Sequence, residues 1–218
     1  MDADVAALRA YITGRLGSEL IEWPGGRPGE AEIALVDAVM SIRARYGRPA
    51  HTVDDIELAP TGVHRAVASY RRLRGESHLD DLAALAHLEA AALTEALGAQ
   101  RTGGVLKAHA IREAAAALTA VEVTCAEKVN PADETQKKAY TSVKGLGWVT
   151  WEYFGMLLGR PGVKADRWVI QAVTNGVGRP VTAREARTIV LQTAADTGHD
   201  PTRLEHALWA YERTRPRS

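Results

Sequence analysis

Residues 134–173 read ETQKKAYTSVKGLGWVTWEYFGMLLGRPGVKADRWVIQAV, and this stretch predicts how the chain is organised. Two helical patterns meet at the short turn Lys144-Gly145-Leu146-Gly147, and a third begins after Pro161-Gly162-Val163 with Asp166 near its start. Two glycines one residue apart permit positive φ angles and a close approach of the backbone. The helix expected from about Trp148 to Leu158 begins with free N–H groups, which can bind a phosphate. An ordinary helix corner, in which the glycines only reverse the chain, explains the same pattern.

This order of glycine turn, helix, Pro-Gly-Val loop and Asp resembles the helix–hairpin–helix DNA glycosylases, the superfamily of endonuclease III, adenine glycosylase and 3-methyladenine glycosylase. Gly145 and Gly147 match the hairpin glycines of that superfamily, and Asp166 falls at the position of its catalytic Asp. The resemblance implies a two-lobed all-α fold and a monofunctional DNA N-glycosylase of base excision repair. An Asp at this position is also favoured simply as the N-cap of the next helix.

The residue two places after the second hairpin glycine separates two kinds of enzyme. Bifunctional members of the superfamily carry a Lys there, whereas this chain has Val149. Because a valine cannot form a Schiff base, the sequence predicts no lyase activity at this position. Lys144 stands at the place of the superfamily's Pro, and we do not assign it as a nucleophile.

A second similarity lies in the amphipathic helix expected from Glu30 to Tyr46, which looks like the first helix of the glycosylase core. Arg43 stands where several relatives have a Gln that fills the gap left by a flipped base, and an Arg can stack and donate hydrogen bonds there. A helix-end arginine that complements the dipole is the alternative. Lys107-Ala108 loosely fits a Lys-Ala pair on a later helix of the superfamily. The DNA-binding residues that we expect are Lys144, Gly145, Gly147, Val149, Lys164 and Arg43.

A flipped base must also be held, and aromatic rings are the usual stacking partners. Trp148, Trp151 and Tyr46 are the candidates for a base pocket, with Trp148 favoured because it directly follows the glycine turn. Aromatic residues at helical spacing are more often part of the core. Trp151 also replaces a small residue of the superfamily, which narrows the space beside the turn.

The composition restricts the class of protein. The chain has 218 residues, a formal net charge of zero and abundant alanine, which favours helices over sheet. The charges are uneven, because residues 137–187 hold nine Lys or Arg against three Asp or Glu. Such a local excess can attract a phosphate backbone, although a solvated helical surface explains it as well. No signal pattern or long apolar run is found, so we expect a cytoplasmic protein and no membrane partner. The resemblance to the glycosylases implies a monomer that binds double-stranded DNA and is then associated with the nucleoid.

Cofactor expectations follow from the residue types present. The single cysteine, Cys125, excludes a four-cysteine iron–sulfur cluster within the chain, and the histidines lack a metal-ligand spacing. We therefore expect no cofactor and no metal site. The resemblance implies only a monovalent cation at the carbonyl oxygens of the hairpin.

The remaining elements complete an all-α pattern of about ten or eleven helices without a clear strand ladder. Residues 119–133 are the least regular stretch and could include a short extended piece, residues 175–180 are expected to form a turn, and Thr182 with Glu185 forms a capping box. By the resemblance, residues 1–29 and 134–218 form one lobe, which carries the hairpin 144–147, and residues 30–133 form the other.

Three hypotheses follow from these observations. The first is a monofunctional glycosylase with Asp166 as its catalytic carboxylate. The second is a noncatalytic DNA-binding protein on the same fold, which grips the DNA backbone with the hairpin. The third is a protein–protein module that has kept the fold and lost DNA binding, as the zero net charge allows.

Overall fold

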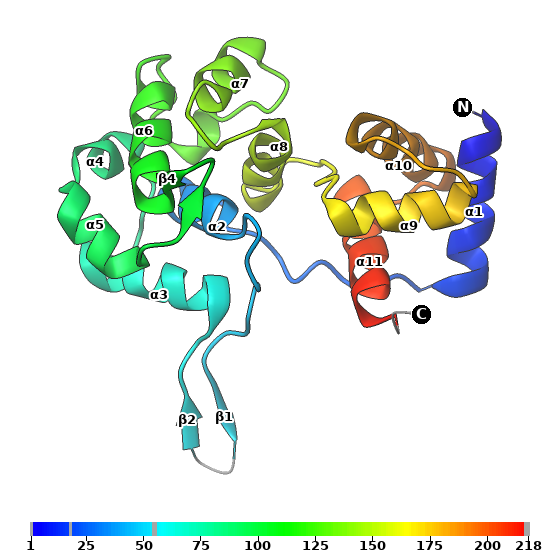
Figure 1. The fold of residues 1–218 in the computed structure, drawn as a ribbon, viewed down its shortest axis with the longest axis horizontal. Helices are drawn as coiled ribbons and strands as arrows, with labels where there is room; N and C mark the ends of the chain where they lie inside the picture. The colour runs from blue at the N-terminus through cyan, green and yellow to red at the C-terminus, as the bar shows by residue number, and fades with distance from the viewer. Residues whose placement is uncertain (1, 18, 54–55, 216–218) are drawn as a thin grey trace. The chain divides into compact units, whose positions relative to one another are not determined.

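The computed structural model describes residues 2–17, 19–53 and 56–215, which form eleven α-helices, one 3-10 helix and two short hairpins (Figure 1). The helices are α1 (Asp2–Arg15), α2 (Ala31–Met40), α3 (Gly62–Arg74), α4 (Leu82–His87), α5 (Ala90–Leu97), α6 (Lys107–Thr119), η1 (Ala126–Lys128), α7 (Glu134–Thr141), α8 (Trp148–Leu157), α9 (Arg167–Val177), α10 (Ala183–Thr197) and α11 (Pro201–Thr214). The strands are β1 (His51–Val53), β2 (Ile56–Leu58), β3 (Arg101–Thr102) and β4 (Val105–Leu106), paired antiparallel as β1–β2 and β3–β4. The predicted all-α class is confirmed. No helix in the described part of the chain is long and apolar enough to span a bilayer.

The chain divides into two compact units. Unit 1 consists of residues 1–25 and 161–218, and unit 2 consists of residues 26–160. This division differs from the predicted lobes, because α7 and α8 belong with the middle of the chain. The physical reason is packing: α7 contacts α6, and α8 contacts α2, within unit 2.

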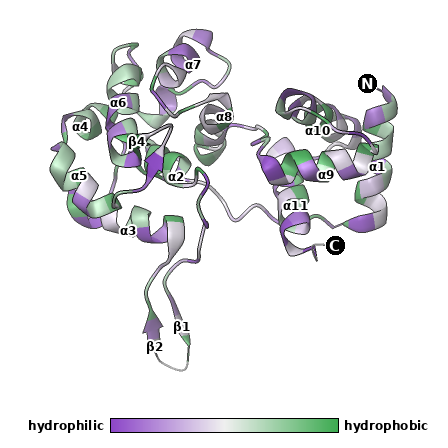
Figure 2. Cartoon of the chain, viewed as in Figure 1, coloured by the Kyte–Doolittle hydropathy of each residue, from purple (hydrophilic) through white to green (hydrophobic). Residues whose placement is uncertain are grey.

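Unit 1 contains α1, α9, α10 and α11, and α9 packs against each of the other three. Hydrophobic and hydrophilic residues both occur along α9, as expected for a helix with one buried face (Figure 2). The predicted turn at residues 175–180 is wrong in part, since α9 continues to Val177 and ends at Gly178 in the left-handed conformation. Gly176 lies in this helix where α1 packs closely, since a Cβ there would lie 2.8 Å from Leu8 Cδ1.

Unit 2 is built around α2. All ten residues of this helix are buried, which fits a helix that contacts α3, α6 and α8 together. Its two carboxylates are buried with partners. Glu32 accepts hydrogen bonds from the Tyr70 hydroxyl and from Asp81 N (3.1 Å), and thereby joins α2 to α3 and to the start of α4. Burial raises the pKa of Glu32, and the bond from Tyr70 opposes that rise.

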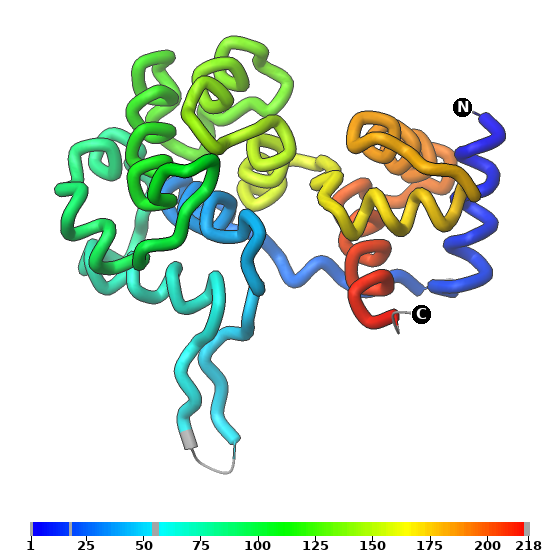
Figure 3. Tube along the Cα trace, viewed as in Figure 1, coloured from blue at the N-terminus to red at the C-terminus, as the bar shows by residue number. Residues whose placement is uncertain are grey.

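Several predicted elements need correction in unit 2. The helix expected from residue 30 to residue 46 ends at Met40, and the chain then turns before it enters the β1–β2 hairpin (Figure 3). Residues 119–133 contain the 3-10 helix η1 and no strand. The two hairpins were not predicted, because strands of two or three residues give too short an alternation to recognise.

Candidate functional site

The turn between α7 and α8 forms where the sequence predicts it. The N-cap of α7 is Asp133, whose Oδ1 accepts hydrogen bonds from two backbone N–H groups of the first turn. α8 begins at Trp148, and its N-cap is Gly147, whose carbonyl accepts a bond from Trp151 N at 3.0 Å. Since glycine has no side chain, the first turn of α8 has no side-chain cap. An uncapped helix start is the kind that binds anions.

Gly145 is held by a second glycine turn, the one that joins β3 to β4. Its φ is +89°, and a Cβ at this position would lie 2.5 Å from Thr102 O. A Cβ at Gly103 would likewise lie 2.6 Å from the Gly145 Cα, so the two turns pack backbone against backbone. The Thr102 hydroxyl, on a largely buried side chain, donates to Gly145 O at 2.7 Å. The β3–β4 turn therefore fixes the conformation of the α7–α8 turn.

The sequence pattern of residues 100–104 does not predict this contact: it indicates a flexible turn before a helix, either a plain loop or a di-glycine helix start that could bind phosphate. A usable signal was present. Gly103-Gly104 is a pair that favours a tight hairpin, and it is followed by Val105, a residue type enriched in strands. What the sequence could not show is that the hairpin lies against a turn more than forty residues further along the chain.

The carbonyl oxygens of this turn bear on the expected monovalent cation. Val143 O accepts a bond from Leu146 N (3.1 Å), and Gly145 O accepts the Thr102 bond. A carbonyl oxygen has two lone pairs, so these bonds are compatible with a cation at the same oxygens, and the cation stays a prediction. Within the described residues, no cluster of three or more His, Cys, Asp and Glu side chains is arranged to hold a metal ion.

Asp166 is the N-cap of α9 in unit 1. Its Oδ1 accepts hydrogen bonds from Trp168 N (2.8 Å) and Val169 N (3.2 Å), so the capping interpretation of this residue is correct. Across the described part of the chain, no donor is bonded to Oδ2. The side chain is half-buried. The cap therefore fixes one carboxylate oxygen and leaves the other available.

The loop before Asp166 is tied to α11. Gly162 N donates to Thr202 Oγ1 at 3.1 Å, and the Thr202 side chain is buried. One turn further along α11, Glu205 is also buried, with 3% of its surface exposed. Burial raises the pKa of Glu205 well above its usual range; the Lys164 charge opposes this rise and the Asp166 charge adds to it. Lys164 and Asp166 therefore share one electrostatic environment in unit 1.

The other predicted DNA-binding residues belong to unit 2. Lys144 and Gly147 are exposed, and Gly145 and Val149 are partly exposed. Arg43 is exposed beyond the end of α2 and has φ +48°, the left-handed region that non-glycine residues rarely adopt. It is therefore not a residue of the last helical turn, as the dipole interpretation required.

Trp151 was predicted to line a base pocket, and the structure contradicts this role. Its side chain is 1% exposed, and its ring lies 5.3 Å from the Tyr140 ring and 5.9 Å from the Phe154 ring, centroid to centroid. Its Nε1 donates to Pro131 O at 3.1 Å. These contacts place Trp151 in the aromatic core between α7 and α8, where it cannot reach a base.

Tyr46 has a structural contact that the sequence did not suggest. Its hydroxyl lies 2.8 Å from both oxygens of the buried Asp37 carboxylate, which also binds the Arg27 guanidinium at 3.1 Å. Tyr153 of α8 donates to the Tyr46 hydroxyl at 3.3 Å, so the network joins the chain beyond α2 to α8. Burial and the Asp37 charge raise the pKa of Tyr46. The available signal was an Asp within an otherwise apolar helix, which must find a partner when buried.

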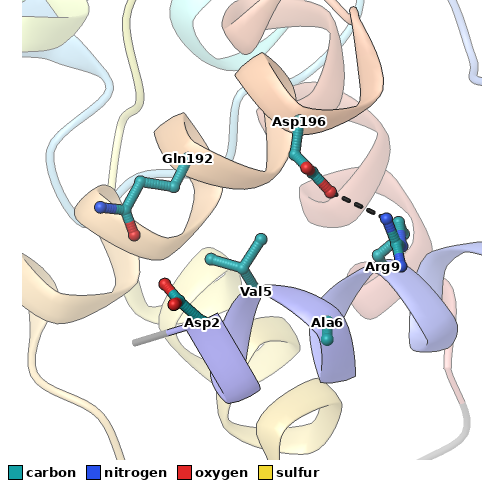
Figure 4. A pocket seen from close by; sticks show the side chains of 6 residues that line it. All are labelled: Asp2, Val5, Ala6, Arg9, Gln192 and Asp196. Atoms are coloured by element: carbon teal, nitrogen blue, oxygen red, sulfur yellow. Dashed lines mark hydrogen bonds and ion pairs between the residues drawn. The ribbon is translucent and has the colours of Figure 1, made fainter.

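Trp148 remains a base-pocket candidate, because it is only half-buried at the start of α8. Hollows occur elsewhere in the described part of the chain. In unit 2, one of about 310 Å³ is lined by Met40, Ala44, Arg45, Gly62, Val63 and Gln100. In unit 1, one of about 390 Å³ lies between α1 and α10, and Figure 4 shows Arg9 directed at Asp196 across it, with Nη1 and Oδ2 2.9 Å apart. No predicted site residue lines either hollow.

Comparison with known proteins places the chain in a family. A protein-family model described as a domain of unknown function, DUF8548, matches residues 7–213. The chain belongs to the DUF8548 family. No curated protein matches its sequence.

Solved structures similar to this DUF8548 chain are DNA glycosylases. The 3-methyladenine DNA glycosylase of Schizosaccharomyces pombe, in complex with abasic DNA, has a TM-score of 0.62 and 14% identity, with 100% of each chain covered. A thermostable thymine-DNA glycosylase has a TM-score of 0.59 and 12% identity, with 100% of this chain and 90% of that chain covered. A trapped covalent intermediate of endonuclease III with DNA has a TM-score of 0.57 and 14% identity, covering 98% and 86%. The predicted glycosylase fold is thus confirmed for this divergent chain.

Proposed function

We propose that this protein is a monofunctional DNA N-glycosylase that removes a damaged or modified base from double-stranded DNA, with Asp166 as the catalytic carboxylate. The observation that carries the proposal is the hydrogen bonding of the Asp166 carboxylate on a glycosylase fold. One oxygen is fixed by the α9 N-cap, and no donor in the described part of the chain occupies the other. A preorganised carboxylate oxygen is what a reaction that builds positive charge requires.

The chemistry follows from that charge. When the bond between C1′ and the base nitrogen breaks, the electron pair leaves with the base and positive charge develops on the sugar. The Asp166 carboxylate stabilises this oxocarbenium character and accepts the proton of the water that attacks C1′. The proton then neutralises the released base. Val149 supplies no amine, so hydrolysis ends at an abasic site without strand cleavage through a Schiff base.

In this proposal the α7–α8 turn contacts the DNA backbone. The uncapped start of α8 offers N–H groups to a phosphate, and the exposed Lys144 adds a positive charge beside them. Lys164 adds a charge in unit 1, and Arg43 enters the duplex at the flipped base. We further propose that the protein acts as a monomer.

The burial of Trp151 favours a second candidate, a noncatalytic DNA-binding protein on the same fold. With Trp151 in the core and the Tyr46 hydroxyl bonded to Asp37, two of the three expected pocket aromatics have structural contacts. A glycosylase-like fold that retains backbone contacts but lacks a base pocket would bind DNA without releasing a base.

A base-release assay separates the two candidates. The protein is incubated with duplexes that carry alkylated, oxidised, deaminated or mismatched bases, beside the Asp166→Asn and Asp200→Asn variants. Asp200 is a matched control, because its Oδ1 also caps a helix of unit 1, at 2.9 Å from Arg203 N. Asparagine is as good an N-cap as aspartate, so both variants should fold.

We expect release to fall by roughly 100-fold or more in Asp166→Asn and to be unchanged in Asp200→Asn, in line with the usual effect of removing a catalytic acid–base group. Salt-dependent DNA binding without release from any duplex would support the noncatalytic candidate. The absence of salt-dependent binding would contradict both candidates.

A further inference from the structure

Lys107 is a buried lysine that the proposed chemistry does not use. It is the first residue of α6, and its side chain is 2% exposed. Its Nζ donates three hydrogen bonds: to Met40 O at 2.9 Å, to Ile42 O at 2.7 Å and to Gln100 Oε1 at 3.1 Å. An ammonium group has three donors, so every donor of Lys107 is used.

Two of these acceptors are carbonyl oxygens at the end of α2. The last carbonyls of a helix lack partners within the helix, and the C-terminal end of the helix dipole attracts a cation. Lys107 donates hydrogen bonds to such carbonyls at Met40 and immediately beyond it, and its positive charge lies at the C-terminal end of the dipole. Burial lowers the pKa of Lys107 to about 8, because it destabilises the charged form of the amine. The hydrogen bonds to these oxygens stabilise the charged form and oppose that effect.

The hydrogen bond from Lys107 Nζ to Ile42 O restrains the backbone next to Arg43. That oxygen belongs to the peptide group that joins Ile42 to Arg43, and the orientation of this group is set by the torsion angles on both sides of it, including the φ of Arg43. Arg43 has φ +48°, a conformation that persists only where its surroundings hold it. Lys107 is the side chain that holds this peptide group.

Packing alone does not fix the same segment. The hollow of about 310 Å³ in unit 2 is lined by Met40, Ala44 and Arg45, which flank Arg43, and by Gln100, which binds Lys107. The segment therefore has open space along one side. Without the bonds from Lys107 it has room to move, and the direction in which the Arg43 side chain leaves the surface is no longer defined.

We propose that Lys107 is a positioning residue for DNA engagement, which fixes the backbone at Arg43 so that the guanidinium is directed into the duplex where a base has been flipped. This proposal rests on the proposed function and adds to it the residue that prepares Arg43 for contact. Preorganisation of a contacting group raises affinity because less conformational freedom is lost on binding.

A double-mutant cycle tests the proposal. The variants are Lys107→Met, which keeps most of the length of the side chain and removes the donors, Arg43→Ala, and the two combined. Fluorescence anisotropy measures the affinity of each for a duplex with an abasic-site analogue and for the undamaged duplex at one salt concentration, and the unmodified protein is also measured at a higher salt concentration. Thermal unfolding checks that each variant is folded. Gln100→Met, which removes one acceptor, is the substitute if Lys107→Met does not fold.

We expect Arg43→Ala and Lys107→Met each to weaken binding to the abasic duplex by about tenfold, the factor that corresponds to a contact of about 1.4 kcal/mol. The combined variant should bind no more weakly than Arg43→Ala, because the two residues act through one contact. Lys107→Met should weaken binding to undamaged DNA much less than binding to the abasic duplex, because it leaves the charge of Arg43 in place. If Gln100→Met is used, the loss should be smaller and should again disappear in the Arg43→Ala background.

Four results would overturn the proposal. Losses that add in the combined variant, or an equal loss on undamaged DNA, would show that Lys107 acts only through general stability. Binding by the unmodified protein that is insensitive to Arg43→Ala would overturn this inference and leave the proposed function standing. No salt-dependent DNA binding by the unmodified protein would overturn both.

Discussion

Gly145→Ala tests whether the α7–α8 turn depends on its contact with the β3–β4 turn. Gly104→Ala is the matched control, because Gly104 also has a positive φ (+86°) and lies in the same pair of turns, but nothing lies within 4 Å of the place where its Cβ would be. Both variants place a Cβ on a left-handed residue. Only Gly145→Ala also pushes that Cβ against the backbone of Thr102.

The expected magnitudes differ accordingly. A left-handed alanine costs about 1–2 kcal/mol, and we expect Gly104→Ala to lose about that much stability. At Gly145 the new Cβ lies 2.5 Å from Thr102 O and 2.7 Å from Thr102 C, so the turns must separate. Overpacking adds about 1–3 kcal/mol, and loss of the bond from the Thr102 hydroxyl adds about 0.5–1.5 kcal/mol. Gly145→Ala should therefore lose roughly 3–6 kcal/mol.

Urea unfolding followed by far-UV circular dichroism measures both variants, and the shift in midpoint gives the loss of stability. The difference between the two variants, at least about 1.5 kcal/mol from the terms above, isolates the contact between the turns. Equal losses for Gly145→Ala and Gly104→Ala would refute the reasoning, because they would show that the turns tolerate separation. A DNA titration of the same variants should show weaker binding for Gly145→Ala alone.

Two further predictions concern the core and the pH dependence. Trp151→Ala should lower the stability by about 3–5 kcal/mol, the usual loss for a buried Trp, whereas Trp148→Ala in the same helix should lose much less; thermal unfolding compares them, and equal losses would contradict the assignment of Trp151 to the core. The backbone N–H and hydroxyl of Thr182, with Arg179, lower the pKa of Glu185 to about 2. Because this pKa lies below the unfolded value of 4.5, the stability from the capping box is present above about pH 4.5 and is lost as the pH falls toward about 2. Melting temperatures measured across this range should fall less steeply for Glu185→Gln than for the unmodified protein, and parallel curves would argue against the capping box as the source.

Local signals in the sequence predicted the structure well. Asp166 caps its helix, Thr182 and Glu185 form the capping box, and α8 begins at Trp148, all as expected. These features depend on residues within one helical turn of each other, so they can be predicted from residues that are close in the sequence. The same local reasoning placed Asp166 correctly at a helix start.

The errors arose where distant contacts decide the outcome. The apolar pattern of α2 continues past Met40, but the helix ends there and Lys107, far along the chain, binds the carbonyls at its end. Trp151 lies on a helix whose apolar residues are spread around its axis, so spacing alone could not tell a core face from a pocket face. Predicting either feature requires knowing which helices pack together.

The division of the chain into two units has a consequence for folding during synthesis. Residues 26–160 are continuous, so unit 2 can complete its core as soon as α8 has emerged from the ribosome. Unit 1 cannot, because α1 is made before unit 2, whereas α9 and α10, against which it packs, are made after unit 2. Until they arrive, Leu8 and Ile12 of α1, which are buried in the finished protein, remain in contact with water. Among the helices that the structure describes, α1 is therefore separated from its packing partners by the longest stretch of synthesis, and its apolar face needs protection on the nascent chain.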